Sequence, residues 1–264
     1  AKNLDPKLVE SLAKAKSKGY ESWQEAKKKS DFKVFLPFFE ELVKLRIEEA
    51  KQISDQYSPW ETLAQPFEPE LTLKWLNKIF QPLKDTLPEL IRGINNSKKY
   101  HWDLSPESQQ NLCSKLLDEL GRDKDLVVVG KSPHPFSITL GPNDYRITTR
   151  IVEGEPLSSF LATAHEWGHS IYEQGLPSQS HQWFAWPLGQ ATSMGIHESQ
   201  SLFWENRIVK SKSFSKRFFK KFVSAGCTLN NYFELWKSIN HLEAGLNRVE
   251  ADELTYGLHI LIRT

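Results

Sequence analysis

Hydrophobic residues recur at helical spacing along most of the chain. Over residues 1–56 they form an apolar stripe through a strongly charged sequence, and Asp5, which a proline follows, is typical of a helix start. Ser58 and Ser105 are also followed by prolines, so each is predicted to be the N-cap of a further helix. Residues 1–121 are therefore predicted to be a helical scaffold.

Residues 72–95 continue the helical pattern but include two prolines. Pro82 and Pro88 have no backbone N–H to donate to the preceding turn, so each is expected to break or kink this helix. The aromatic side chains along the stretch are predicted to lie in the core rather than to bind a ligand.

Alternating, β-rich sequence replaces the helical pattern after residue 121. Three runs of this kind lie between residues 125 and 153, and Gly141-Pro142-Asn143 is a turn signal between the last two. They predict a small antiparallel sheet within the segment 122–155. The edge of this sheet could pair with an extended peptide by β-strand addition. Alternatively, the sheet could serve only as a cover for the core.

Helical spacing returns in residues 156–264. Pro156 suits a first helical turn, Gly175 suits a C-terminal cap, and apolar residues recur at helical intervals between them. In the basic run over residues 210–221, three phenylalanines fall at helical spacing, which favours an amphipathic helix with its lysines in solvent. Anion or nucleic-acid binding is the alternative for that run. The predicted fold class is mainly α.

Composition limits the classes of function. With 264 residues, of which 39% are hydrophobic and 12% aromatic, the chain can build one sizeable core as a single catalytic domain. Its formal net charge of +1 argues against a general nucleic-acid binder. Cys113 and Cys227 give no disulfide framework and are predicted to be buried free thiols. No apolar run approaches membrane-spanning length and no signal peptide leads the chain, so we expect a cytoplasmic protein without a membrane partner.

The strongest chemical signal is the pattern H-E-x-x-H formed by His165, Glu166 and His169. On a helix, positions i and i+4 face the same side, so the two imidazoles can bind one cation. Zinc accepts neutral imidazole nitrogens at about 2.0–2.1 Å, and Glu166 would face the open coordination position where a water sits. This layout is typical of a hydrolase. The alternative is two surface histidines on an amphipathic helix.

A catalytic zinc site needs a third protein ligand, which we expect from another element. His197 and Glu198 are adjacent in a second helical pattern, and adjacent helical positions face about 100° apart, so only one is expected to point at the metal. We take Glu198 as the ligand and His197 as a group that supports the ligands or faces the substrate. A structural zinc protein would need a fourth protein ligand, for which His197 and then His181 are the candidates.

Five motifs, in this order, resemble those of the carboxypeptidase Taq family of metallocarboxypeptidases. They are HPF from His134, DYRIT from Asp144, HEWGHSIYEQG from His165, GIHESQSLFWENR from Gly195 and NRVEADELTYGLHI from Asn247. The resemblance implies a mainly helical, gluzincin-like fold with a small sheet beside the HExxH helix and a long substrate groove. It also implies a zinc or cobalt ion, and release of single amino acids from peptide C-termini.

Carried over by motif, the resemblance implies that His165, His169 and Glu198 are the metal ligands and that Glu166 is the catalytic base. The ion would lower the pKa of its bound water toward ~7 and polarise the scissile carbonyl. Glu166 would take a proton from that water and pass it to the leaving amine.

An exopeptidase also needs a cation that captures the terminal carboxylate of its substrate, and a guanidinium group suits this best. Arg146 and Arg248 lie within the family motifs and are the candidates, with a salt bridge to a nearby aspartate as the alternative role for each. His134 and His197 complete the predicted substrate-binding set.

The chain departs from the family at both ends. Family members usually carry a helical segment before the point where this chain starts, and C-terminal GxxQDxHW and GYFPTY-like motifs that are missing here. The chain therefore resembles the central portion of the family. The alternative to an active enzyme is a truncated, catalytically impaired fragment that binds zinc and peptides and needs the missing segments. The expected partners are peptide substrates, and either a second copy in a homodimer or those missing segments.

Overall fold

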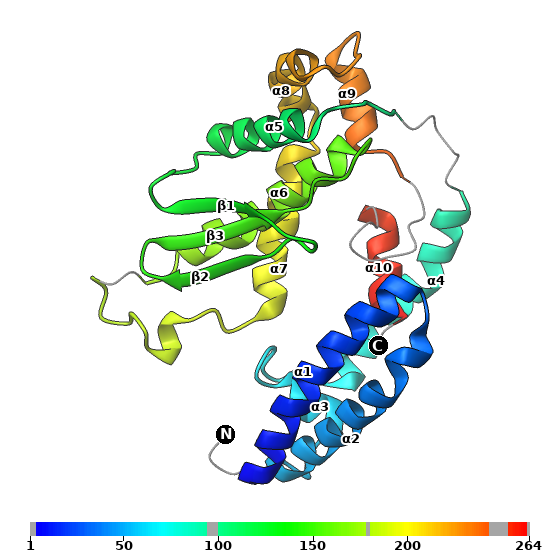
Figure 1. The fold of residues 1–264 in the computed structure, drawn as a ribbon, viewed down its shortest axis with the longest axis vertical. Coiled ribbons are helices and arrows are strands. Elements are labelled where there is room, and N and C mark those ends of the chain that lie inside the picture. The colour runs from blue at the N-terminus through cyan, green and yellow to red at the C-terminus, as the bar shows by residue number, and fades with distance from the viewer. Residues whose placement is uncertain (1–3, 94–99, 178–179, 243–252, 263–264) are drawn as a thin grey trace. The chain divides into compact units, whose positions relative to one another are not determined.

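The computed structural model describes residues 4–93, 100–177, 180–242 and 253–262, and it is mostly helical with one small sheet (Figure 1). Contacts within the chain divide it into two compact units, Ala1–Leu76 and Asn77–Thr264, and each is described by itself. The prediction of one catalytic domain that includes both units stays a prediction. Among the described residues, no helix combines the length and apolar character needed to cross a bilayer.

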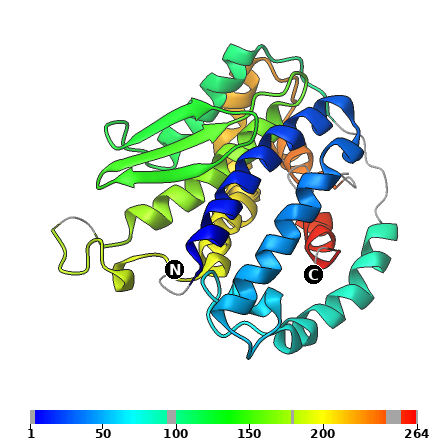
Figure 2. The same cartoon turned by 60° about the horizontal axis from the view of Figure 1, so that its bottom comes forward.

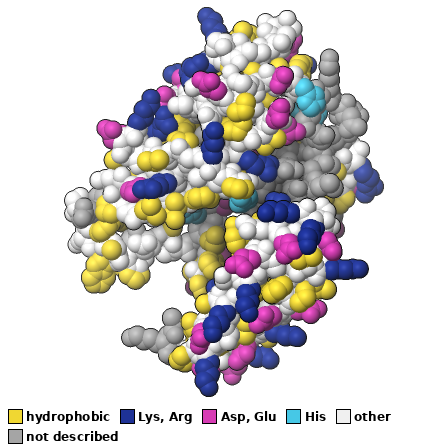
Figure 3. Space-filling model, viewed as in Figure 1, with side chains coloured by type: hydrophobic (Ala, Val, Ile, Leu, Met, Phe, Trp, Pro, Cys, Tyr) yellow, Lys and Arg dark blue, Asp and Glu magenta, His cyan; other side chains and the backbone are white. Residues whose placement is uncertain are grey.

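The first unit is a set of helices that begin where the cap signals predict. Its elements are α1 (Pro6–Lys29), the 3-10 helix η1 (Phe32–Val34), α2 (Leu36–Ile53) and α3 (Pro59–Ala64). The Asp5 carboxylate accepts a hydrogen bond from the backbone N–H of Lys7, and Ser58 and Glu61 form a reciprocal capping box. Basic and acidic side chains are interspersed over the face of this unit seen in Figure 3, in keeping with the small net charge of the chain.

Helix α4 (Leu73–Arg92) runs through both of its prolines without a break, so of the two predicted outcomes, a break or a kink, the break is wrong. The carbonyls that lose a helical donor to Pro82 and Pro88 belong to Lys78 and Lys84. Both lysines are exposed, so water can satisfy these carbonyls and the cost of each proline is reduced.

The second unit carries the sheet and the remaining helices. Its further elements are α5 (Pro106–Glu119), β1 (Val127–Lys131), β2 (Ser137–Gly141), β3 (Asp144–Thr149), α6 (Pro156–Gln174), η2 (Pro187–Gly189), α7 (Met194–Leu202), the π-helical η3 (Phe203–Val209), α8 (Lys212–Ala225), α9 (Tyr232–Ile239) and α10 (Glu253–Leu261). Helix α6 is central, because it packs against β2, β3, α5, α7 and η3 (Figures 1 and 2). Ser105 caps α5 and Pro156 starts α6, as predicted.

The sheet is mixed, with the strand order β1-β3-β2, so the prediction of an antiparallel sheet is corrected. The turn at residues 141–143 joins β2 to an antiparallel β3 as expected, but β1 pairs with β3 in parallel. Pro133 and Pro135 in the connection after β1 lack N–H groups, which opposes a tight hairpin between β1 and β2. Strand β3 instead lies between β1 and β2. The backbone N–H of Ser132 donates to the carbonyl of Thr149, and the N–H of Thr148 donates to the carbonyl of Phe136.

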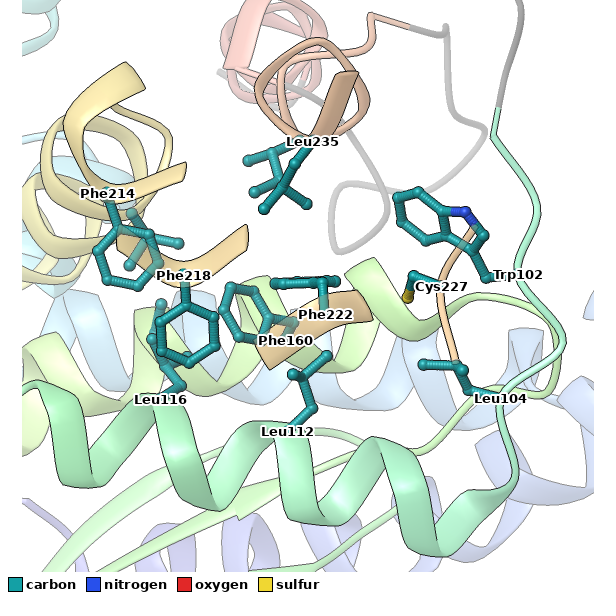
Figure 4. Close-up of a cluster of buried hydrophobic side chains, with 13 residues drawn as sticks. Trp102, Leu104, Leu112, Leu116, Phe160, Phe214, Phe218, Phe222, Cys227 and Leu235 are labelled. Atoms are coloured by element: carbon teal, nitrogen blue, oxygen red, sulfur yellow. The ribbon is translucent and has the colours of Figure 1, made fainter. Parts of the chain in front are cut away.

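A phenylalanine cluster anchors α6 to α8 (Figure 4). Phe160 of α6 is fully buried, and its ring lies 5.4 Å from that of Phe218 and 4.9 Å from that of Phe222. Full burial of such a side chain contributes about 1.5–3 kcal/mol. From Lys212 onward the basic run therefore forms the predicted amphipathic helix, with its phenylalanines inside and lysines such as Lys216 exposed. Lys210 precedes the helix and, against the prediction, is buried, with its Nζ 3.7 Å from Oε1 of Glu205. Cys113 and Cys227 are buried free thiols, as predicted.

Candidate metal centre

Helices α6 and α7 bring two histidines and one glutamate together. His165 and His169 lie on one face of α6, with their ring centroids 4.9 Å apart. Glu198 reaches them from α7: its Oε2 is 3.6 Å from Nε2 of His165 and 3.3 Å from Nε2 of His169. The three side chains thus converge on one point from two separate elements, as the sequence predicted.

A glycine allows this approach of α7 to α6. A Cβ at Gly168 would lie 2.5 Å from the Cα of Ser201 and 2.7 Å from the carbonyl oxygen of Gln200, both in the backbone of α7. Real Cβ atoms essentially never come so close to other atoms. The glycine of the HEWGH motif is therefore a packing requirement, and it sets the distance between Glu198 and the histidines.

The geometry fits a divalent ion. Two ligands that are each about 2.1 Å from a tetrahedral ion lie roughly 3.4 Å apart. The separations from Oε2 of Glu198, 3.3 and 3.6 Å, bracket that value, and the ligand atoms of the three residues all lie within 4.8 Å of one another. Imidazole nitrogens and a carboxylate oxygen are ligands that zinc accepts, and three protein ligands leave one position open.

No fourth protein ligand joins this group among the residues that the structure describes. His197 turns toward Nδ1 of His169, at 2.7 Å between the two Nδ1 atoms. His181 is exposed in the loop after α6, and its Nδ1 accepts a hydrogen bond from the backbone N–H of Trp183. The described residues therefore favour an open site over a closed structural zinc site.

Each ligand has a hydrogen-bond partner behind it. Nδ1 of His165 lies 3.0 Å from Oε2 of Glu205 in η3, and the hydroxyl of Tyr256 in α10 donates to Oε1 of Glu198 at 2.6 Å. Such partners orient metal ligands and fix the tautomer of a ligating histidine. The centre is thus supported by segments of α6, α7, η3 and α10.

The charged groups of this centre shift the pKa values of one another. Burial alone would lower the pKa of His165, but the carboxylates of Glu198 and Glu205 outweigh it and raise the pKa to about 10. Burial would raise the pKa of Glu198, yet hydrogen bonds from His165, His169 and Tyr256 hold that pKa well below its usual range. The negative charge that Glu198 keeps suits a cation.

Glu166 lies beside the ligands and is buried, with 7% of its surface exposed. Burial raises the pKa of Glu166 to about 7, a rise that His165 opposes and the charges of Glu198 and Glu205 reinforce. A carboxyl group with a pKa near neutrality can both accept and release a proton at physiological pH. This is the property expected of a general base that also acts as an acid.

The predicted substrate-binding residues are more scattered. Arg146 is engaged by Asp144 through two hydrogen bonds, Nε–Oδ1 at 2.9 Å and Nη2–Oδ2 at 3.1 Å. Arg146 precedes Ile147 on β3, and Ile147 is buried in the cluster between the sheet and α6. Successive residues of a strand point to opposite faces, so Arg146 faces the other side of the sheet. The geometry favours the aspartate salt bridge for Arg146. His134 is exposed in the connection between β1 and β2, and Arg248 lies outside the described residues.

Sequence reasoning missed three residues of the centre: Glu205, Glu173 and Tyr256. Glu205 follows Glu198 by seven positions, two helical turns, and Glu173 follows His169 by four, so helical spacing could have found both. Tyr256 lies in a segment distant along the chain, and no spacing rule connects it to Glu198.

Comparison with known proteins agrees with this centre. The model of the carboxypeptidase Taq (M32) metallopeptidase family matches residues 1–264. The chain belongs to this family. It is 35% identical over 282 residues to thermostable carboxypeptidase 1 of Thermus thermophilus, covering all of this chain and 54% of that protein. It is 37% identical over 259 residues to carboxypeptidase 1 of Bacillus subtilis, covering 94% of this chain and 50% of that protein.

The fold agrees with that of solved M32-type structures. The crystal structure of BsuCP superposes with a TM-score of 0.90 at 35% identity, covering 99% of this chain and 54% of that one. The chain therefore spans about half the length of the relatives it matches. Membership in a metallopeptidase family implies a divalent ion, and the group His165, His169 and Glu198 is a site that can hold it.

Proposed function

We propose that this chain carries the metal centre of a zinc-dependent carboxypeptidase, which releases C-terminal amino acids from peptides. The observation that carries the proposal is the convergence of His165, His169 and Glu198, with the buried carboxyl of Glu166 next to them. Family membership supports peptides as the substrate class, since both relatives named above are carboxypeptidases.

Zinc is the proposed ion, with cobalt as the alternative. His165, His169 and Glu198 would hold it. Two neutral imidazole nitrogens and one carboxylate are a ligand set found in catalytic zinc sites. When bound, such an ion supplies a Lewis acid for the scissile carbonyl and makes water a better nucleophile.

The proton transfers belong to Glu166 in this proposal. Its carboxylate accepts the proton of the attacking water, and the resulting carboxylic acid donates a proton to the leaving amine. A pKa raised to about 7 by burial places the group between these two roles at neutral pH.

The outer edge of β2 is the proposed position of the peptide backbone. β2 is an edge strand in the order β1-β3-β2, and it packs against α6. The hydroxyl of Thr139 on β2 lies 3.4 Å from Oε2 of Glu173 on α6, so this edge runs near the helix that carries the histidines. An extended peptide could add to it as a further strand.

Recognition of the terminal carboxylate remains a proposal for Arg248 and His134, because Arg146 is already engaged by Asp144. The chain spans about half the length of its relatives, so hydrolysis by the chain on its own is part of the proposal. The missing family segments as partners, the homodimer, the cytoplasmic location and an impaired fragment as the alternative also remain predictions.

The test combines metal content with turnover. Elemental analysis should find one zinc ion per wild-type chain after dialysis, none in His165→Ala, and one in the control His181→Ala, whose histidine is exposed in a loop. Release of the C-terminal residue from an N-blocked dipeptide should follow the metal content. Stoichiometric zinc in His165→Ala, or hydrolysis that does not depend on zinc, would reject the proposal.

A further inference from the structure

A chain of hydrogen bonds leads from a carboxylate to one of the two histidines of the metal centre. Nε2 of His197 lies 2.8 Å from Oε1 of Glu173, and Nδ1 of His197 lies 2.7 Å from Nδ1 of His169. The ring of His197 packs against those of His169 and Tyr172, with centroids 4.7 and 4.9 Å away. The side chain of His197 is thus held at both nitrogens and by two ring contacts.

The chemistry of these groups sets the direction of each hydrogen bond. The carboxylate of Glu173 can only accept, so Nε2 of His197 is the donor in that contact. In a neutral imidazole with its proton on Nε2, Nδ1 carries a lone pair and accepts. With His197 neutral, Nδ1–H of His169 donates to Nδ1 of His197, because two lone pairs cannot form a hydrogen bond.

With a divalent ion bound, this arrangement would leave the lone pair of His169 on Nε2, where the ion would take the place of the proton that Nε2 donates to Glu198. That nitrogen is the one 3.3 Å from Oε2 of Glu198, on the side where the ligand atoms converge. With the ion bound, His165 would reach the same tautomer by a shorter route, because Nδ1 of His165 contacts Glu205 directly. The two histidines are thus supported differently, one by a carboxylate and the other by a carboxylate acting through an imidazole.

We propose that Glu173 and His197 are positioning residues, which set the tautomer and ring orientation of His169 so that its Nε2 can bind the metal ion. This role deepens the metal site proposed above and rests on it. It assigns His197 to the support of a ligand rather than to the substrate. It also gives Glu173 a role that the HExxH pattern does not contain.

Zinc affinity, measured by competition with a chromophoric chelator, tests the role without relying on turnover. His197→Ala and Glu173→Ala should each weaken zinc binding about 10–100-fold, the range for loss of a partner behind a ligand. Glu173→Gln keeps an oxygen acceptor for Nε2–H and should recover most of the affinity lost in Glu173→Ala. The controls His181→Ala and Glu153→Ala make the same changes at exposed positions and should bind zinc as the wild type does.

A spectroscopic signature separates positioning from simple destabilisation. In zinc-loaded wild-type protein, ¹H–¹⁵N imidazole spectra should show a protected Nδ1–H of His169, and His197→Ala should lose that protection. Circular dichroism checks that each variant is folded. If His197→Ala is not folded, the comparison of Glu173→Ala with Glu173→Gln, which keeps the shape of the side chain, tests the role instead.

The outcomes distinguish the two levels of the proposal. If the wild-type chain binds no zinc, both the metal site and this inference are wrong. If the wild type binds zinc, and His197→Ala and Glu173→Ala bind it equally tightly, only the inference is overturned. A spectrum that places the proton of His169 on Nε2 would overturn it as well.

Discussion

Gly168→Ala should detach Glu198 from the two histidines. A Cβ at position 168 would lie 2.5 Å from the Cα of Ser201 and 2.7 Å from the carbonyl oxygen of Gln200. Both atoms belong to the backbone, so rotation of a side chain cannot relieve the contact. An ordinary separation of 3.4 Å requires the helices to move apart by 3.4 − 2.5 = 0.9 Å.

Such a movement is large for a metal site. Ligand distances are held to within about 0.2 Å, so a shift of this size removes Glu198 from the ligand set. Zinc affinity should therefore fall by more than the ~10–100-fold expected for loss of a supporting partner. Overpacking costs about 1–3 kcal/mol, whereas alanine gains only about 1 kcal/mol over glycine inside a helix. The free energy of unfolding should fall too.

Chelator competition and urea unfolding measure the two effects. Gly141→Ala is the matched control, because a Cβ at Gly141 would meet nothing within 4 Å, and this variant should bind zinc normally. The reasoning would be refuted if Gly168→Ala bound zinc like the wild type and unfolded at higher urea concentration. That result would show that close helix packing does not set the position of Glu198.

Three further predictions concern the catalytic base, the protonation of the ligands and the core. Glu166→Gln should keep its zinc but lose at least about 10²–10⁴-fold in peptide turnover, since the amide cannot accept the proton, and unchanged turnover would exclude Glu166 as the base. Zinc binding should release protons near pH 7, because Glu198 and Glu205 raise the pKa of His165 to about 10 and the ion displaces that proton. Affinity should therefore rise with pH up to about 10, and a pH-stat titration without proton release would contradict this. Phe160→Ala should lower the free energy of unfolding by about 3–5 kcal/mol. Phe233 is 40% exposed, so Phe233→Ala should change this free energy little. Similar losses in both variants would refute the assignment of Phe160 to the core.

Local signals in the sequence predicted the local structure well. Asp5, Ser58 and Ser105 cap helices where the cap patterns indicated, because a side chain that satisfies a free N–H acts within three residues. The spacing of His165 and His169 fixed one face of α6 for the same reason. These features depend on neighbours along the chain, and the sequence shows such neighbours directly.

Features that depend on distant contacts could not be predicted in this way. The parallel pairing of β1 with β3 results from a crossover that no alternation pattern encodes. The π-helical hydrogen bonding of η3 does not follow from apolar spacing either, although the seven positions between Glu198 and Glu205 could have placed Glu205 near the centre. Tyr256 reaches Glu198 across 58 positions of sequence, so only the folded chain reveals the contact.

The central claim is that one divalent ion binds between α6 and α7 with an open coordination position. Anomalous diffraction at the zinc edge from crystals of the zinc-loaded chain tests it most directly. We predict one peak about 2.0–2.2 Å from Nε2 of His165, Nε2 of His169 and a carboxylate oxygen of Glu198, with no fourth protein ligand. A peak elsewhere, a fourth ligand such as His197, or no peak at full zinc loading would contradict the account.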